Sequence, residues 1–273
     1  MAPGDGQGLL RGMTHSSTAL SSADDPTAPA RPSDVAEALD SVRTVALGLL
    51  IAMAIQTAAL QPYTIPSSSM EPGLVTGDYV VTSKYAYGWS RASLPFDPPL
   101  FAGRLFGRDP ARGDVVLFRL PRDRQQVWVK RLIGLPGDRV QVLGGQVFVN
   151  GRAIPQAAAG TVRDHDDPAR QVRLVRETLP GGRSWQTYDG GPSPADDTEA
   201  FIVPAGAYLM MGDNRDNSLD GRFPREIGVG LLPAENIVGR AEVVVASWKP
   251  GASLFKPWTW FNLQPGRFFK RVR

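Results

Sequence analysis

Three segments of the sequence carry residue types that can do chemistry together, and the first of them is rich in serine. Residues 61–74 contain a run of serines that ends at Ser69 and lies between Pro66 and Pro72. Proline restricts its own backbone and that of the residue before it, so this segment can hold a hydroxyl group at a fixed place. The same composition is also common in linkers. Taken alone, the segment leaves a nucleophilic serine and a linker both open.

A lysine ends an apolar strand pattern in the second segment. Alternation along residues 127–130 places Trp128 and Lys130 on one face of the predicted strand. If that face is buried, the charged form of the lysine is destabilised and its pKa falls from about 10.4 toward neutrality. A neutral lysine can take a proton from a serine hydroxyl. The alternative is an ordinary surface lysine on a strand.

The third segment, residues 211–222, is a dense polar loop after an apolar strand. Asp and Asn side chains stabilise turns, and an arginine can hold a carboxylate with two hydrogen bonds, so the loop is suited to internal bonding. A calcium loop is the competing interpretation. The order Asp-Asn-Arg-Asp-Asn from Asp213 lacks the glycine and the terminal glutamate of an EF-hand loop and places a cation among the acids. We therefore expect no metal site and no cofactor.

The composition narrows the chemistry further. The 273 residues include no cysteine and only two histidines, His15 and His165. This excludes disulfides, thiolate catalysis and cysteine-based zinc sites, and it leaves little material for a Ser-His-Asp triad. A hydrolase built from this chain needs another base. The formal charge of +3 favours anionic lipid as readily as nucleic acid, and we expect no nucleic-acid partner.

Taken together and in this order, the three segments resemble the bacterial type I signal peptidases, the serine-lysine proteases that remove secretory signal peptides. The resemblance covers the chain from an apolar segment at residues 44–60 to about Ala246. The matching motifs are Pro66-Ser67-Ser68-Ser69-Met70, Lys130-Arg131 with Gly134-Leu135-Pro136-Gly137-Asp138, and Gly212-Asp213-Asn214-Arg215-Asp216-Asn217-Ser218 with Asp220 and Arg222.

The resemblance implies roles for individual residues. It makes Ser69 the nucleophile and Lys130 its general base, and it makes Ser67 a side-chain donor to the oxyanion beside the Ser69 backbone N–H. The neutral lysine then removes the serine proton as the hydroxyl attacks, and the donors stabilise the developing negative charge. An acyl-enzyme forms, and water releases it.

Three residues of the polar loop receive supporting roles from the same resemblance. Ser218 would hydrogen-bond Lys130 and orient it, and Asp220 and Arg222 would brace the loop as a salt bridge. Gly221 departs from the commonest family pattern, in which a serine often stands between that Asp and that Arg, so one supporting hydrogen bond is in doubt.

The resemblance also implies two small, shallow pockets for the side chains at substrate positions −1 and −3, which explains selection for Ala-x-Ala. The residues expected to bind the substrate in these pockets are Tyr63, Ile65, Pro66, Met70, Leu74, Val80, Leu117, Trp128 and Val129.

The first element that must position these residues is an apolar segment. Residues 44–60 contain no charged side chain and have roughly the minimum length of a membrane span. A buried core helix and a cleaved signal peptide are the alternatives. The distance from the first residue and the rigid turn sequence that follows favour an uncleaved anchor over residues 43–61. Arg31 and Arg43 precede the span and the next basic residue is Lys84, which favours a cytoplasmic N-terminus.

Short runs of β-branched and aromatic residues, separated by glycine and proline, predict a mainly β fold after the transmembrane helix. We expect an all-β catalytic domain of folded sheets or a barrel, with an inserted smaller β subdomain. The predicted segments are a disordered tail at 1–34, the span at 43–61, the catalytic domain at 62–151 and 201–247, the inserted subdomain at 152–200, and an aromatic and basic C-terminal segment at 248–273. The last segment suits a bilayer interface; binding of single-stranded nucleic acid or packing on its own domain are the alternatives.

The sequence therefore predicts a single-pass protein of the bacterial inner membrane, with a cytoplasmic N-terminus and an extracytoplasmic catalytic domain. We expect a monomer that contacts membrane lipid and cleaves secretory preproteins after a small-x-small site. Two alternatives stay open: a specialised Ser-Lys peptidase for a conjugation or pilus protein, and an inactive membrane-tethered β module used for binding. A self-cleaving repressor-type protease shares the chemistry, but the anchor argues against it.

Overall fold

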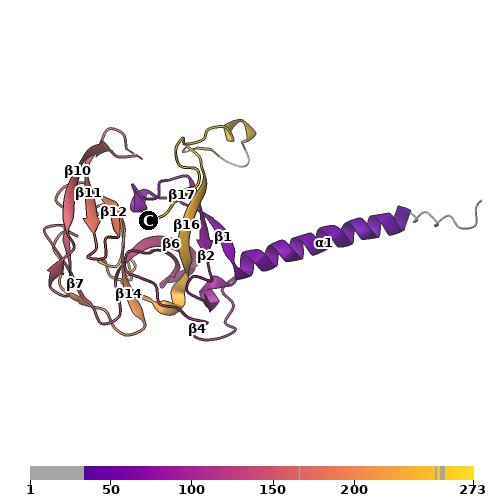
Figure 1. Ribbon diagram of the computed structural model, residues 1–273, viewed down its shortest axis with the longest axis horizontal. Coiled ribbons are helices and arrows are strands. Elements are labelled where there is room, and N and C mark those ends of the chain that lie inside the picture. Colours follow the sequence, from indigo (N-terminus) through magenta and orange to yellow (C-terminus); the bar gives the residue numbers. More distant parts are fainter. Residues whose placement is uncertain (1–33, 166, 250, 253–255) are drawn as a thin grey trace, which may run out of the picture. The chain divides into compact units, whose positions relative to one another are not determined.

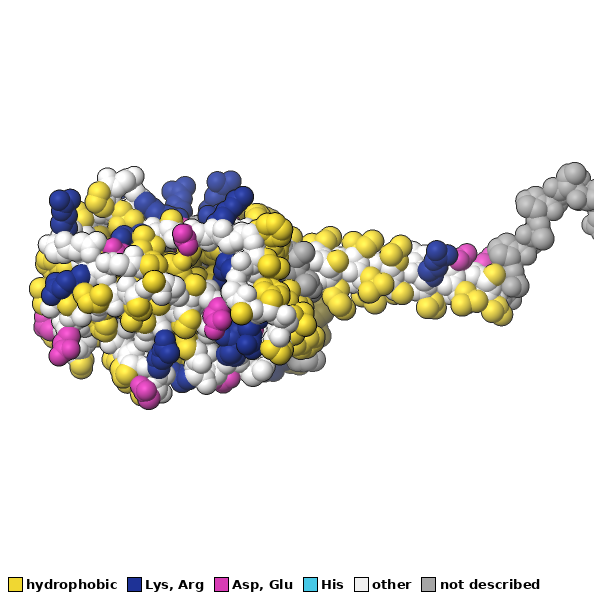
Figure 2. Space-filling view, turned by 90° about the horizontal axis from the view of Figure 1, so that it is seen from below, with side chains coloured by type: hydrophobic (Ala, Val, Ile, Leu, Met, Phe, Trp, Pro, Cys, Tyr) yellow, Lys and Arg dark blue, Asp and Glu magenta, His cyan; other side chains and the backbone are white. Residues whose placement is uncertain are grey.

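The first element of the structure is an apolar helix. The computed structural model describes residues 34–273 except 166, 250 and 253–255, and it opens with α1 (Asp34–Ala58). Within this helix, Val35–Ile55 is long and apolar enough to cross a membrane, with a mean hydropathy of 1.8, and none of it is buried by the described protein. On the face of the helix seen in Figure 2, hydrophobic side chains lie along most of its length. A helix that is apolar on most sides and uncovered by protein is suited to lipid.

The helix differs from the predicted span, 43–61, at both ends. It begins at Asp34, because the residues ahead of the apolar run include alanine, glutamate and leucine, which are strong helix formers. It ends at Ala58, ahead of Pro62, which disfavours helical backbone at the residue before it. Leu60 already belongs to the first strand. All but the last residue of the predicted tail, 1–34, lies outside the described residues.

The chain after the helix is built from β-strands around one large sheet, which confirms the mainly β prediction (Figure 1). Its strands follow the order β1-β2-β16-β5-β6-β14-β15, β17 pairs with β16, and every pairing is antiparallel. The strands are β1 (Leu60–Thr64), β2 (Asp78–Ser83), β5 (Val115–Leu120), β6 (Asp123–Gly134), β14 (Ala207–Met211), β15 (Leu231–Pro233), β16 (Ile237–Ser247) and β17 (Lys270–Arg271).

Between β6 and β14 the chain leaves this sheet and forms two smaller ones. A four-stranded sheet has the order β13-β7-β8-β9 and a three-stranded sheet the order β10-β11-β12. The polar stretch 152–200 therefore contains strands of its own. The β7–β8 hairpin that precedes it pairs with β9 and β13 and not with the large sheet. The strands are β7 (Arg139–Leu143), β8 (Gln146–Val149), β9 (Arg152–Ala153), β10 (Gln156–Arg163), β11 (Gln171–Thr178), β12 (Ser184–Asp189) and β13 (Phe201–Ile202).

Strand β5, in the middle of the large sheet, is buried on both faces, which explains why its sequence is continuously apolar. Val115 and Leu117 belong to one buried cluster, whereas Val116 and Phe118 belong to a second. Because successive side chains of a strand point to opposite faces, β5 must supply apolar side chains to both cores. A strand held from both sides is a rigid support for its neighbour β6.

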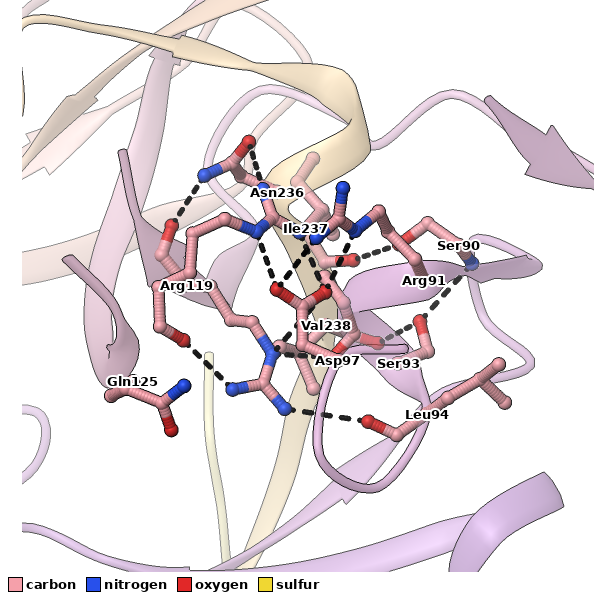
Figure 3. Close-up of polar contacts among 12 residues, drawn as sticks. Ser90, Arg91, Ser93, Leu94, Asp97, Arg119, Gln125, Asn236, Ile237 and Val238 are labelled. Carbon is pink, nitrogen blue, oxygen red and sulfur yellow. Dashed lines mark hydrogen bonds and ion pairs between the residues drawn. The ribbon is translucent and has the colours of Figure 1, made fainter. Parts of the chain in front are cut away.

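A buried carboxylate ties the connection after β2 to this sheet. Asp97 lies between three arginines and accepts hydrogen bonds from Arg91 and Arg124, the latter at 2.7 Å from Nη2, while Arg119 Nε lies 3.9 Å away (Figure 3). These hydrogen bonds, led by those from Arg124, lower the pKa of Asp97. The arginines come from the η2 turn (Arg91–Ser93), β5 and β6, so one carboxylate joins three elements. The remaining elements are β3 (Trp89–Ser90), β4 (Arg104–Leu105), η1 (Ser68–Met70), η3 (Ala234–Asn236) and η4 (Pro257–Thr259).

Candidate active site

Ser69 lies in the short turn η1, and backbone hydrogen bonds hold this turn on both sides. The Ile65 N–H donates to the Asp78 carbonyl at 2.8 Å, and the Gly77 N–H donates back to Ile65 at 2.9 Å. From the polar loop, the Asn214 N–H donates to the Ser69 carbonyl at 3.2 Å. The serine-rich segment is therefore a fixed turn and not a linker.

Lys130 reaches this serine from β6. Its Nζ donates hydrogen bonds to Ser69 Oγ at 2.7 Å and to the Val129 carbonyl at 3.1 Å. Lys130 is only 3% exposed, and its Nζ lies 5.3 Å from the centroid of the Trp128 ring. The surface-lysine interpretation is therefore wrong, and the burial on which a lowered pKa depends is present at Lys130.

Burial changes the acidity of this lysine. Loss of hydration lowers the pKa of Lys130 from 10.5 to about 8, against the charges of Asp220 and Asp213, which raise it, and with a smaller lowering from Arg222. A lysine with such a pKa has a usable neutral fraction near neutral pH. The pair can therefore transfer a proton from the hydroxyl to the amine, as a nucleophile and its general base must.

Ser67 directly precedes the η1 turn as its N-cap residue. Its Oγ lies 3.3 Å from Ser69 Oγ, at hydrogen-bonding distance, and its side chain lines the cavity beside Ser69. A hydroxyl at this position can turn its proton toward an oxygen that forms next to Ser69. The role of Ser67 as an oxyanion donor stays a prediction, and this position is compatible with it.

Ser218 does not make the predicted hydrogen bond to Lys130 in the structure. Its Oγ is buried and has no hydrogen-bond partner among the described residues, while the Val129 carbonyl accepts from Lys130 instead. The hydroxyl lies against Gly212, where a Cβ atom would come within 2.3 Å of it. Ser218 still lines the cavity, so it contacts the site without orienting the lysine.

The predicted ion pair between Asp220 and Arg222 is present. Arg222 Nε donates to Asp220 at 2.9 Å, and the other carboxylate oxygen accepts from the Gly212 N–H at 2.8 Å. Burial alone would raise the pKa of Asp220, but the charge and hydrogen bonds of Arg222 outweigh it, so the pKa is lowered. The carboxylate therefore stays charged and fixes the loop beneath Ser69.

Two further buried ion pairs support the loop. Arg131, the residue after the lysine, holds Asp213 with two hydrogen bonds of 2.7 and 2.6 Å. Arg215 holds Glu177 of β11 with two of 2.5 Å. The sequence indicated that arginines of this loop could clamp carboxylates, but it gave no signal for Glu177, which comes from the inserted sheet.

A carboxylate next to the turn was also missed. Glu71 is fully buried two residues after Ser69, and its Oε1 lies 3.3 Å from Nδ1 of His165, in the connection between β10 and β11. The inserted strands thus contact the nucleophile segment as well as the polar loop. Among the described residues, no three His, Asp or Glu side chains gather in a way that could hold a metal ion.

A cavity of about 610 Å³ opens beside Ser69 and Lys130. Six of the nine predicted substrate-binding residues line it: Tyr63, Ile65, Pro66, Leu117, Trp128 and Val129. The other three, Met70, Leu74 and Val80, are 0% exposed and pack in the hydrophobic core behind the turn, so they shape the wall from behind and do not contact a substrate. Residues that line the cavity without having been predicted as pocket residues include Thr64, Gln126, Val127, Asp216, Asn217, Leu219 and Phe223.

Comparison with known proteins shows the family to which the chain belongs. The model of the family described as signal peptidase, peptidase S26, matches residues 38–248. Signal peptidase I of Rickettsia typhi is 38% identical over 210 residues, which cover 74% of this chain and 77% of the relative. Signal peptidase I of Rickettsia canadensis is 37% identical over 216 residues, which cover 76% of this chain and 79% of the relative. The chain therefore belongs to the signal peptidase family, peptidase S26, and is a serine peptidase whose N-terminal helix fits a single membrane anchor.

Proposed function

We propose that this peptidase removes signal peptides from secretory preproteins, with Ser69 as the nucleophile and Lys130 as the general base. The observation that carries the proposal is the hydrogen bond of 2.7 Å between a buried lysine amine and the serine hydroxyl. Burial explains how the amine can be neutral, and the relatives of the chain are signal peptidases. In the described part of the chain, no other pair of cavity residues places a hydroxyl group within hydrogen-bond distance of a basic side chain.

Each step of the reaction can be written on these atoms. Neutral Lys130 takes the Ser69 proton as Oγ attacks the scissile carbonyl carbon, and the oxyanion that forms is stabilised by the Ser67 hydroxyl. The lysine then gives its proton to the leaving amine of the mature protein, which leaves an ester on Ser69. Water loses a proton to the lysine and attacks the ester. As the ester bond breaks, the lysine returns this proton to Ser69 Oγ, and the signal peptide departs with a new carboxyl group that ionises in water.

Two strand edges can hold the substrate in an extended conformation. β1 is an edge strand of the large sheet. β14 pairs with β6 only from Arg131 onward, so among the described residues no strand pairs on that side with the part of β6 before the lysine. Both edges line the cavity beside Ser69. An extended peptide can therefore add to them through main-chain hydrogen bonds.

This placement explains a preference for small residues at alternate positions. Side chains of an extended chain alternate, so those at −1 and −3 point to the same side and the one at −2 points away. The wall of the cavity includes the large side chains of Tyr63, Leu117 and Trp128. They leave room for alanine at −1 and −3, whereas position −2 is free to vary.

We further propose that the N-terminus is cytoplasmic and that the catalytic part lies outside the cytoplasm of a bacterium, at the inner membrane. The support is the position of Arg43 at the start of the apolar run and the absence of a basic residue between it and Lys84. A monomer is sufficient for this chemistry, because both reacting side chains come from one chain.

Cleavage of a purified preprotein by the detergent-solubilised enzyme tests the substrate class. The expected product begins at the residue after a small-x-small site, and a preprotein with leucine in place of alanine at −1 is expected to stay uncut. Efficient cleavage of the leucine variant would contradict the pocket assignment. If only a single dedicated protein is cut, the general function is wrong and a specialised processing peptidase takes its place.

A further inference from the structure

A second cavity of about 780 Å³ lies on the part of the large sheet formed by β2, β16 and β17. It shares no lining residue with the cavity beside Ser69, and the proposed reaction does not use it. It is lined by Leu60, Val81, Tyr85, Asp114, Val115, Arg183, Arg240, Ala241, Glu242, Val243, Phe269, Arg271, Val272 and Arg273.

Positive charge is in excess in this cavity. Two of its four arginines are paired inside it: Arg183 with Asp114 at 2.7 Å, and Arg240 with Glu242 at 2.9 Å. The other two, Arg271 and Arg273, are exposed and form no ion pair among the described residues. Two guanidinium groups of the walls therefore have no acidic side chain as a partner among the described residues, and such groups suit a ligand with several anionic oxygens, such as a phosphate.

The same cavity has an apolar side. Leu60, Val243 and Phe269 contribute to the lining, and Leu60 and Phe269 are 40% and 77% exposed. A binding site for a free inorganic anion needs no such surface. A phosphate that carries an apolar chain would satisfy both parts of the cavity.

The chain itself brings this cavity near a bilayer. Leu60 follows Ala58, the last residue of α1, by two residues, which span at most about 7 Å of chain. Because α1 has the length and hydropathy of a membrane span, Leu60 lies at or near the headgroup layer, whichever end of the helix faces the cytoplasm. The strand register places an arginine of the cavity near Leu60: Leu60 pairs with Ser83 of β2, and Ser83 pairs with Arg240 of β16. The charged wall of the cavity is therefore close to the membrane surface as well.

We propose that this cavity binds the phosphodiester headgroup of an anionic glycerophospholipid. Arg271 and Arg273 donate hydrogen bonds to the phosphate oxygens, and Leu60, Val243 and Phe269 contact the glycerol and the first part of the acyl chains. The site fixes the catalytic sheet at the membrane surface, and it is independent of which peptide the enzyme cleaves.

Lipid retention by the full chain in an uncharged detergent tests this site. Native mass spectrometry compares dioleoylphosphatidylglycerol with dioleoylglycerol, which has no phosphate, and with dioleoylphosphatidylcholine, whose choline opposes the arginines. The double variant Arg271→Gln/Arg273→Gln is compared with Arg152→Gln/Arg176→Gln, which changes two exposed arginines outside the cavity.

Wild type and the control variant are expected to retain phosphatidylglycerol over both other lipids. The cavity variant should bind phosphatidylglycerol about 25-fold more weakly, because each arginine contributes roughly fivefold. If the cavity variant lowers the midpoint of thermal unfolding, Arg273→Gln alone is measured, with the fivefold loss expected. Equal retention by the cavity variant, or an equal loss in the control, would overturn the proposal. Displacement of the lipid by inorganic phosphate at the same concentration would overturn the lipid as the ligand.

Discussion

Replacing Lys130 by methionine should abolish cleavage while stabilising the folded protein at neutral pH. Burial lowers the pKa of this lysine from 10.5 to about 8, and a difference of that size means that the charged lysine opposes folding by about 3 kcal/mol at pH 7. Methionine has a similar length and no charge. It leaves Ser69 Oγ and the Val129 carbonyl without their donor, which costs about 1 kcal/mol for each. The net gain at pH 7 is about 1 kcal/mol.

The difference in folding stability between Lys130→Met and the wild type should change sign with pH. The folded pKa is below the unfolded one, so between about 8 and 10.5 the unfolded chain binds more protons and the stability of the wild type rises with pH. At pH 10 the penalty has fallen to about 1 kcal/mol, whereas the lost hydrogen bonds still cost about 2 kcal/mol. Lys130→Met is then less stable than wild type by about 1 kcal/mol.

Thermal unfolding of the detergent-solubilised chain at pH 7 and pH 10, at one scan rate, measures this crossover. For a protein of this size, 1 kcal/mol corresponds to a shift of about 2–4 °C in Tm. Lys249→Met, at an exposed lysine, is the matched control and should show no change of sign. A Lys130→Met variant that is less stable than wild type by the same amount at both pH values would refute the desolvation argument.

Four other outcomes follow from the site. The kcat/KM for peptide cleavage should rise about tenfold per pH unit up to about pH 8 and then level off, because the neutral Lys130 is the base; a rate that is flat between pH 6 and 8 contradicts this. Ser67→Ala should lower kcat by roughly two to three decades without moving that pH profile, and a rate within a few-fold of wild type removes the oxyanion role. Asp213→Ala leaves the buried Arg131 charge unpaired and should destabilise the fold by about 3–5 kcal/mol in thermal unfolding; an unchanged Tm would show that the pair is dispensable. Trp128→Ala should raise the rate on a preprotein with leucine at −1 or −3, relative to alanine, about tenfold, and an unchanged ratio would place this ring outside the pockets.

The roles of Ser69 and Lys130 came from the family resemblance, and the local signals of the sequence were compatible with them but left a linker and a surface lysine open. Proline on both sides of Ser69 restricts one turn, and alternation along one strand places Lys130 and Trp128 on the same face. The mainly β fold follows from short apolar runs between turn residues in the same way. Such signals depend on a few neighbouring residues and are independent of how the rest of the chain folds.

The errors concern the direction of side chains near the site and contacts made across long separations in the chain. Met70 follows the nucleophile and Val80 lies in the adjacent strand, so both are close to the site in sequence, yet both point into the core. Glu177 has no feature that marks it as the partner of Arg215, because the pairing depends on how the inserted sheet docks. Ser218 was expected to bond the lysine, but the Val129 carbonyl of the same strand accepts instead.

The most direct test of the account is to incubate a secretory preprotein with wild type, Ser69→Ala and Lys130→Ala enzymes and to identify the products by mass spectrometry. The account predicts one cut after a small-x-small site by the wild type and none by either variant, with both variants retaining the wild-type circular dichroism spectrum. Continued cleavage by Lys130→Ala at a comparable rate would contradict the serine-lysine mechanism.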